Sequence, residues 1–304
     1  MPRTVTVGLD GSPESLAAAD WAAREARLLT AELRLLHAGG RPPSGRAPSA
    51  GGAVPPPADH ADHADHADHA DHADHADRAD RSTALLQRTE AALAQRYPGL
   101  TVTSGQTPER PTAALTAAAR ATELLVLGSA GPGRTAGLLP GPVAAAVLAR
   151  AERPVVLVPA DGNDTGPGVG RGDVVLGVAR PGRPSDAVLE FALDAAERRG
   201  AALRVVCGRA APPRPGTGQG TEDDLLGHAS AALHEALRPW RDKYPCVEVT
   251  EETVIGSAGA HLADAARDAS LLVLGCRARR PGVGPVTRTV LRHTGAPVAL
   301  VPHT

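Results

Sequence analysis

The chain has 304 residues, of which 42% are hydrophobic, so it is long enough for about two domains that each bury a core. A net charge of −2 gives no reason to expect nucleic acid or an anionic membrane as partner, and aromatic residues at 2% leave few platforms for base stacking.

The N-terminus leads directly into the first expected strand, at residues 3–9, without the charged and apolar segments of an export signal. No apolar run approaches the roughly 18 residues that a membrane-spanning helix needs. The cysteines Cys207, Cys246 and Cys276 form an odd set without metal-binding spacing, which favours reduced thiols. We therefore expect a cytoplasmic protein.

Short runs rich in Val and Leu alternate with Ala-rich stretches, a pattern typical of a parallel sheet with crossover helices. The first helix is expected to begin at Pro13, with Ser12 as its cap. Strands are expected in the first half at residues 3–9, 33–37, 100–104, 124–128 and 154–158. In the second half they are expected at residues 174–178, 203–207, 247–250, 271–275 and 297–301.

An insert at residues 39–81 follows the second expected strand. Its first part is rich in Pro and Gly, and from Ala58 to His75 the triplet Ala-Asp-His occurs six times. A loop can grow here at little cost, so we expect a solvated segment that extends the following helix or lacks fixed structure. Because His and Asp are zinc and nickel ligands, loose metal binding is the alternative, without a defined metal site.

The two halves of the chain repeat one another. Residues 123–128 read ELLVLG and residues 270–275 read SLLVLG, while 153–159 read RPVVLVP and 296–302 read APVALVP. We therefore expect a first domain at residues 1–160 and a second at 173–304. The segment between them, 161–172, is rich in Gly and Asp and indicates a flexible linker.

Two glycine-rich turns in the first copy follow expected strands. One contains Leu9, Asp10 and Gly11, and the other runs from Gly128 to Val143. If the first and fourth strands are neighbours, both turns lie at the switch point of the sheet, where ligands bind. Glycines let the backbone approach a phosphate, and Asp10 is placed to accept hydrogen bonds from a ribose.

The spacing Gly128-x2-Gly131-x9-Gly141 resembles the nucleotide loop of the universal stress protein family, and both ends of the copy resemble that family too. The resemblance covers both halves and implies a tandem member. It implies an α/β fold of two Rossmann-like, adenine nucleotide alpha hydrolase-like domains, each a five-stranded parallel sheet of order 3-2-1-4-5 with helices on both faces. It also implies that the two copies pair through their last strands; a homodimer is left open.

The resemblance implies that ATP is the ligand, with Mg²⁺ accompanying its phosphates. Asp10 matches the residue that contacts ribose and adenine, Ala38 the backbone that meets adenine, and Val143 a backbone donor. Pro142 stands where the family has Ser or Thr and removes two donors, each worth roughly 1.5–3 kcal/mol towards a charged group. The full expected binding set is Leu9, Asp10, Gly11, Ala38, Leu127, Gly128, Gly131, Gly133, Gly141, Pro142 and Val143.

The second copy departs further from the pattern. Ala179 stands near the position of Asp10, Ala278 replaces the second glycine, and the loop before Gly284 is four residues shorter. We therefore expect that this copy does not bind ATP in the family's manner and serves as an intramolecular partner.

Neither GxSxG nor GxxxxGK[ST] occurs, no catalytic residue stands out, and we expect no enzyme activity. His37, His293 and Cys276 are interpreted as packing or capping residues. The leading hypothesis is a regulatory protein of the stress response that senses an adenine nucleotide, mainly in the first domain. The rivals are a ligand-free interaction protein of the same fold and a metal-buffering protein that uses the His-rich insert.

Overall fold

The computed structural model describes residues 3–39, 65–129, 140–160, 172–209, 222–277 and 283–303, with side chains of the second range described from residue 80 onward. The first copy contains β1 (Thr4–Gly8), α1 (Pro13–Leu28), β2 (Glu32–Ala38), α2 (Asp65–Arg96), β3 (Val102–Thr107), α3 (Pro111–Ala121), β4 (Leu124–Ser129), α4 (Pro142–Leu148) and β5 (Val155–Pro159). The second contains β6 (Val174–Val178), α5 (Asp186–Arg199), β7 (Leu203–Arg209), α6 (Glu222–Lys243), β8 (Val249–Ile255), α7 (Ala258–Ala265), β9 (Leu271–Arg277), α8 (Pro285–His293) and β10 (Val298–His303).

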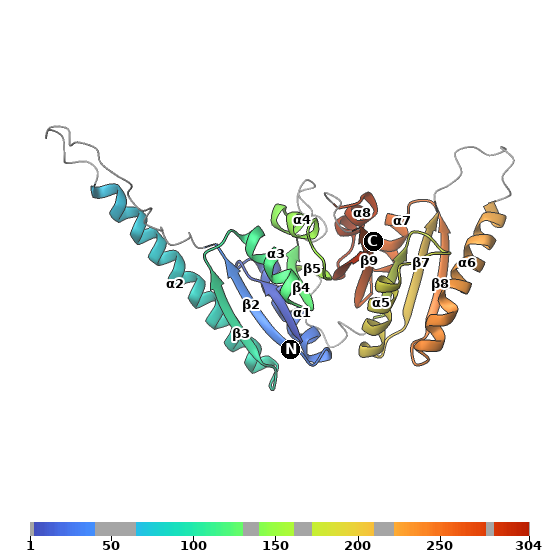
Figure 1. The fold of residues 1–304 in the computed structure, drawn as a ribbon, viewed down its shortest axis with the longest axis horizontal. Helices are drawn as coiled ribbons and strands as arrows, with labels where there is room; N and C mark the ends of the chain where they lie inside the picture. The colour runs from blue at the N-terminus through green and yellow to red at the C-terminus, as the bar shows by residue number, and fades with distance from the viewer. Residues whose placement is uncertain are drawn as a thin grey trace, which may run out of the picture.

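The ten strands form one sheet, in the order β3-β2-β1-β4-β5-β10-β9-β6-β7-β8. Within each copy the strands are parallel and follow the order 3-2-1-4-5, so the predicted fold class is confirmed. The copies meet where β5 and β10 pair antiparallel, with Val298 opposite Leu157 and Leu300 opposite Val155. The two halves therefore lie side by side, with α2 and α6 at the outer ends (Figure 1).

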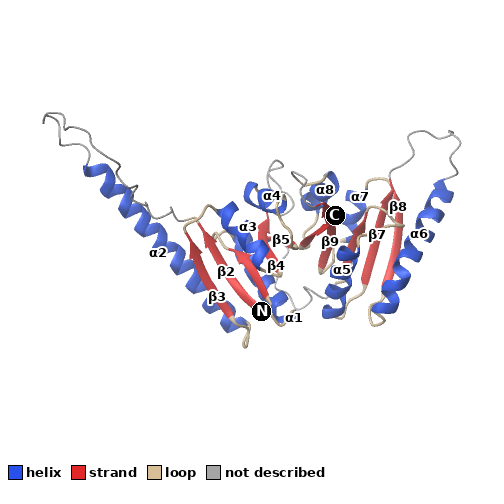
Figure 2. Cartoon of the chain, viewed as in Figure 1, coloured by secondary structure: helices blue, strands red, loops and turns tan. Residues whose placement is uncertain are grey.

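Helices cover both faces of the sheet, as Figure 2 shows. Leu124 and Val126 of β4 pack into the core on the face covered by α1, α2, α5 and α6, whereas Leu125 and Leu127 pack into the core on the opposite face. Because both faces of the strand are buried, β4 needs an unbroken apolar run. Internal strands of this kind can therefore be predicted from the sequence.

The third strand of each copy begins two residues later than the sequence predicts. Leu100 and Val247 instead lie in turns, where their N–H groups donate to the carbonyls of Tyr97 and Tyr244, each at 3.1 Å. The strands themselves begin at Val102 and Val249 and carry mostly polar residues (VTSGQT and VTEETVI). They lie at the two ends of the sheet, where one edge faces solvent and an apolar run is not required.

Helix α1 begins as predicted. Pro13 is its first residue, and the N–H of Ser15 donates to the Ser12 hydroxyl at 3.1 Å. Its buried face is made largely of alanines, which allows the helix axis to approach the sheet closely. The small residues therefore set how near α1 lies to the ends of the strands.

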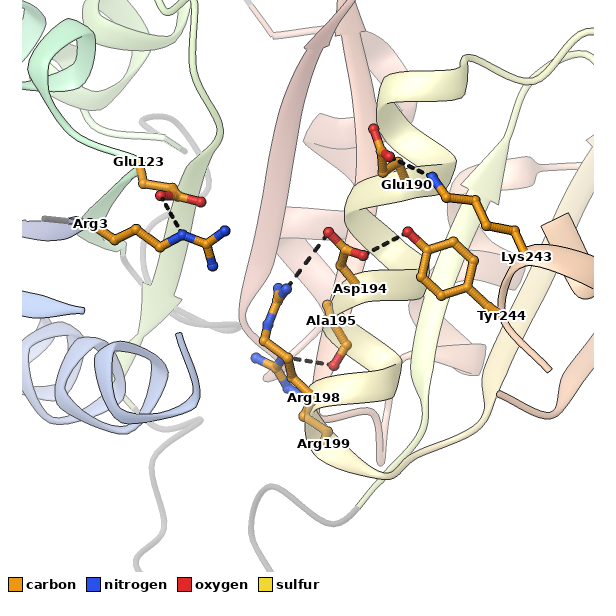
Figure 3. A network of polar contacts seen from close by, with 9 residues as sticks. All are labelled: Arg3, Glu123, Glu190, Asp194, Ala195, Arg198, Arg199, Lys243 and Tyr244. Atoms are coloured by element: carbon orange, nitrogen blue, oxygen red, sulfur yellow. Dashed lines mark hydrogen bonds and ion pairs between the residues drawn. The ribbon is translucent and has the colours of Figure 1, made fainter. Parts of the chain in front are cut away.

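Each copy contains the same polar contact between its first and second long helices. The Tyr97 hydroxyl donates to Asp20 at 2.8 Å, and the Tyr244 hydroxyl donates to Asp194 at 2.7 Å. An arginine four residues after each aspartate pairs with it, at 3.0 Å in the first copy and 3.8 Å in the second. Figure 3 shows the second set, with Asp194 lying between Tyr244 and Arg198.

An ion pair joins the copies on the α1 and α5 side. Glu25 of α1 accepts a hydrogen bond from Arg199 of α5, and the side chains are only 3% and 7% exposed. The second Arg199 nitrogen donates to the Ala195 carbonyl at 3.0 Å. Burial with satisfied partners makes this pair sensitive to the loss of either member.

The main chain of the His-rich insert continues helix α2 from Asp65 onward. The histidine side chains and residues 40–64 lie outside the described residues, so the metal hypothesis stays a hypothesis. Among the helices that the structure describes, none is both long and apolar enough to cross a membrane.

Candidate functional site

The turn after β1 lies at the switch point of the first copy. β1 is flanked by β2 on one side and β4 on the other, so the chain winds in opposite directions from it. The carboxyl ends of these three strands meet at one edge of the sheet. A crevice at this place is where an open α/β sheet binds ligands.

A cavity of about 410 Å³ opens at this edge. Most of the predicted binding set lines it: Leu9, Asp10, Ala38, Leu127, Gly128, Gly141, Pro142 and Val143. Gly11 does not line it, and Gly131 and Gly133 lie outside the described residues. The lining residues outside the predicted binding set are Gly8, Ser12, Glu14, Ser15, Leu36, Pro111, Leu115, Ser129 and Ala144.

Gly11 has a structural reason of its own. Its φ is +86°, in the region that L side chains rarely adopt. Glycine here lets the chain turn sharply from β1 into the cap of α1. Gly11 therefore shapes the turn that carries Asp10, and its contact with a ligand stays a prediction.

Asp10 is held in place by the start of α1. Its Oδ1 accepts hydrogen bonds from the Ser12 N–H at 2.9 Å and from the Ser12 hydroxyl at 2.6 Å. Burial raises the pKa of Asp10, but the hydrogen bonds from Ser12 and Ser15 outweigh it and hold the pKa below its ordinary value. The carboxylate is thus ionised at neutral pH.

The two described loop glycines differ in what they make room for. A Cβ on Gly128 would lie 2.6 Å from the Glu14 carbonyl carbon and 2.7 Å from the Ser15 nitrogen, so this glycine lets α1 close onto the end of β4. A Cβ on Gly141 would meet nothing within 4 Å. Among the described residues, the position beside Gly141 is therefore free of protein atoms.

Pro142 lines the same space as the first residue of α4. A proline at this position suits the helix but brings neither an N–H nor a hydroxyl to the cavity. The main-chain contribution of this turn to a phosphate is consequently smaller than Ser or Thr would give.

The other side of the cavity is apolar. Leu36 and Ala38 come from the end of β2, and Pro111 and Leu115 come from α3. A flat, uncharged group such as a purine can bury its faces against such a wall. No local motif in the sequence joins these four residues, because two distant elements supply them.

His37 does not line the cavity and instead contacts Leu9 and Ser82. Its Nδ1 lies 2.7 Å from the Leu9 carbonyl, which only accepts, so Nδ1 is the donor; its Nε2 lies 3.0 Å from the Ser82 hydroxyl. The ring thus ties the ends of β1 and β2 to α2. This geometry agrees with the interpretation of His37 as a packing residue.

Comparison with known proteins identifies the chain. The family model described as "Universal stress protein family" matches residues 1–159 and again residues 173–302. A universal stress protein of Mycobacterium tuberculosis is 30% identical over 97% of this chain and 93% of its own length, and one of Mycolicibacterium smegmatis is 29% identical over 98% and 96%. A crystal structure of a universal stress protein from Archaeoglobus fulgidus shares the fold, with a TM-score of 0.63, 16% identity and coverage of 99% and 98%. The chain therefore belongs to the universal stress protein family and carries two copies of its domain in tandem.

Proposed function

We propose that the first copy binds an adenine nucleotide, ATP with its Mg²⁺, and that the chain acts as a regulatory protein of the stress response. The observation that carries this proposal is the cavity described above. The ionised Asp10 carboxylate, the free space at Gly141 and an apolar wall all line it. Its volume of about 410 Å³ falls in the range of small-molecule sites.

Each part of the ligand has a counterpart. Asp10 would accept hydrogen bonds from the ribose hydroxyls, and Leu36, Ala38 and Leu115 would bury the adenine. Gly141 and the backbone of Val143 would face the phosphates, together with Gly131 and Gly133 if the loop follows the family pattern. Mg²⁺ would enter as part of the nucleotide and would neutralise phosphate charge.

The cavity suits binding better than turnover. Its described lining contains the carboxylates of Asp10 and Glu14 and the hydroxyls of Ser12, Ser15 and Ser129, but no His, Lys or Cys. Asp10 has a lowered pKa and is a weak base. We therefore place the chain among sensors that bind a nucleotide in the cytoplasm, where its cysteines stay free.

Calorimetric titration with ATP and AMP tests this proposal. Asp10→Ala should weaken both ligands about 10- to 100-fold, the value of hydrogen bonds to a charged group. Asp242→Ala is the matched control, because Asp242 is exposed on α6 of the other copy. Equal heats for wild type and Asp10→Ala would show that this cavity is not the nucleotide site.

A ligand-free scaffold is the second candidate, and Pro142 favours it. The β5–β10 pairing already gives the second copy a structural task. Protein that is purified without bound nucleotide, and that shows no thermal shift with any nucleotide, would support this reading over the first. Metal buffering is tested separately, since deleting residues 58–81 should abolish nickel or zinc retention if the insert holds the metal.

A further inference from the structure

The second copy has a cavity of its own, which shares the positions matching Gly8, Asp10 and Gly128 with the first cavity but otherwise has a different lining. It measures about 770 Å³ and lies between the start of α5 and the carboxyl ends of β6, β9 and β10. We propose that this cavity binds a small phosphate-bearing anion through Arg180, Arg183 and Arg277. The proposal does not depend on nucleotide binding by the first copy.

A longer connection after the first strand opens the cavity. Helix α1 begins five positions after Gly8, whereas α5 begins nine positions after the matching Gly177. The added residues include Arg180 and Arg183, and both line the cavity. The turn after β6 lacks the nucleotide-binding pattern of the first copy, but it supplies two cationic side chains to the cavity.

The helix start also stands off from the sheet. In the first copy, the backbone of Glu14 and Ser15 would lie within 2.7 Å of a Cβ on Gly128. At the matching Gly275, the nearest atoms are side-chain atoms of His303 and Val188, at 2.9 and 3.3 Å. In the described chain, side chains and not backbone lie nearest to Gly275, and the cavity lies between α5 and the ends of β9 and β10.

The charge in this space is strongly positive. Arg180, Arg183 and Arg277 are exposed, and within the part of the chain that the structure describes none of them takes part in an ion pair. Asp186 is the single carboxylate in the described lining. Other arginines of this copy are paired: Arg204 with Glu252 at 2.7 Å, and Arg241 with Glu251.

Arginine matches phosphate in both charge and shape. The planar guanidinium donates two parallel hydrogen bonds to a phosphate, so three arginines around one cavity favour that ligand over a singly charged one. Ser185 caps α5 without a side-chain hydrogen bond, and it also lines the cavity. The volume leaves room for an organic group attached to the phosphate.

This cavity matches the proposed nucleotide site only in part. The described lining contains no residue of β7, α7 or α8, whereas the first cavity is built partly from the matching β2, α3 and α4. It opens instead on the side where α5 covers the sheet. The two copies therefore present their cavities on different sides of the strand ends.

Calorimetry on the full chain with inorganic pyrophosphate and with ribose 5-phosphate tests the proposal. Arg180→Gln/Arg183→Gln/Arg277→Gln should bind at least 10-fold more weakly than wild type. The control Arg88→Gln/Arg150→Gln/Arg238→Gln removes the same charge from exposed positions elsewhere and should bind as wild type does. Preference for ribose 5-phosphate would assign an organic phosphate, and preference for pyrophosphate an inorganic one.

Asp10→Ala separates this site from the proposed nucleotide site. It should leave pyrophosphate binding unchanged while it weakens ATP binding. All three arginines are exposed, so the triple variant should keep the wild-type melting temperature. The proposal is overturned if wild type binds neither probe, or if the triple variant binds them with wild-type affinity.

Discussion

The two copies agree where they pack and differ where their strands end. Both keep the strand order, the Tyr–Asp contact and the buried run of the fourth strand. At the carboxyl edge, one copy places Asp10 in a compact turn, while the other has a longer turn with Arg180 and Arg183. Duplication thus preserved the positions that hold each sheet together and left the binding edge free to change charge.

The strongest test of how the copies are joined is the buried pair Glu25–Arg199. Glu25→Ala should lower the free energy of unfolding by about 3–5 kcal/mol, since it leaves a buried guanidinium without its partner. Glu235→Ala, in an exposed pair with Arg238, should cost no more than about 1 kcal/mol. Urea denaturation of both variants measures the difference, and equal losses would show that the Glu25 pair does not hold the copies together.

The next largest effect concerns Gly128 and its match Gly275, which should tolerate an added methyl group differently. Gly128→Ala pushes a methyl group against the backbone of Glu14 and should cost about 1–3 kcal/mol, as overpacking does. Gly275→Ala meets only side chains, which can rotate, and should cost less than about 1 kcal/mol. Thermal unfolding of the two single variants compares them. A larger loss for Gly275→Ala would contradict the difference in helix placement.

A substitution at Pro142 should raise the affinity for ATP instead of lowering it. Pro142→Ser restores an N–H and a hydroxyl beside the open space at Gly141 and should strengthen ATP binding about 10-fold, or roughly 1.4 kcal/mol. AMP should gain less, because its single phosphate reaches fewer of these donors. The same change at Pro285, which heads α8 of the second copy, should leave ATP binding as it was.

The smallest expected effect concerns a feature that the copies share. Burial raises the pKa of Tyr97 and of Tyr244 to about 12, with help from the aspartates that accept their hydrogen bonds. A raised pKa stabilises the fold below pH 10.0, the ordinary tyrosine value, and this contribution is lost as the pH rises towards 12. Between pH 10.0 and 12, the free energy of unfolding of Tyr97→Phe/Tyr244→Phe should therefore fall less than that of the wild type.

The chain has two tyrosines in all, so tyrosinate absorbance reports these groups alone. Native protein should titrate well above pH 10. A native midpoint at the ordinary value would mean that the two aspartate contacts do not form in solution.

The sequence predicted much of the fold because buried parallel strands need apolar runs on both faces. It placed the third strands too early, since edge strands such as Val102–Thr107 carry polar residues. In the site, Asp10 and Gly141 followed from spacing along the chain, whereas Leu36, Pro111 and Leu115 come together only through the sheet order. The arginine cavity was missed because loss of a motif was interpreted as loss of binding, although the substituted residues carry charge.

The ion pair between the copies has a consequence for how such chains assemble. Counting from the shared aspartates Asp20 and Asp194, Glu25 and Arg199 occupy the same position in their respective helices. Two first copies meeting in this way would set glutamate against glutamate, and two second copies arginine against arginine, both in a site closed to water. Because the two copies carry opposite charges at this matching position, each copy pairs better with the other than with itself. Two different domains in one chain can have such a pair, whereas a symmetric dimer of identical subunits cannot.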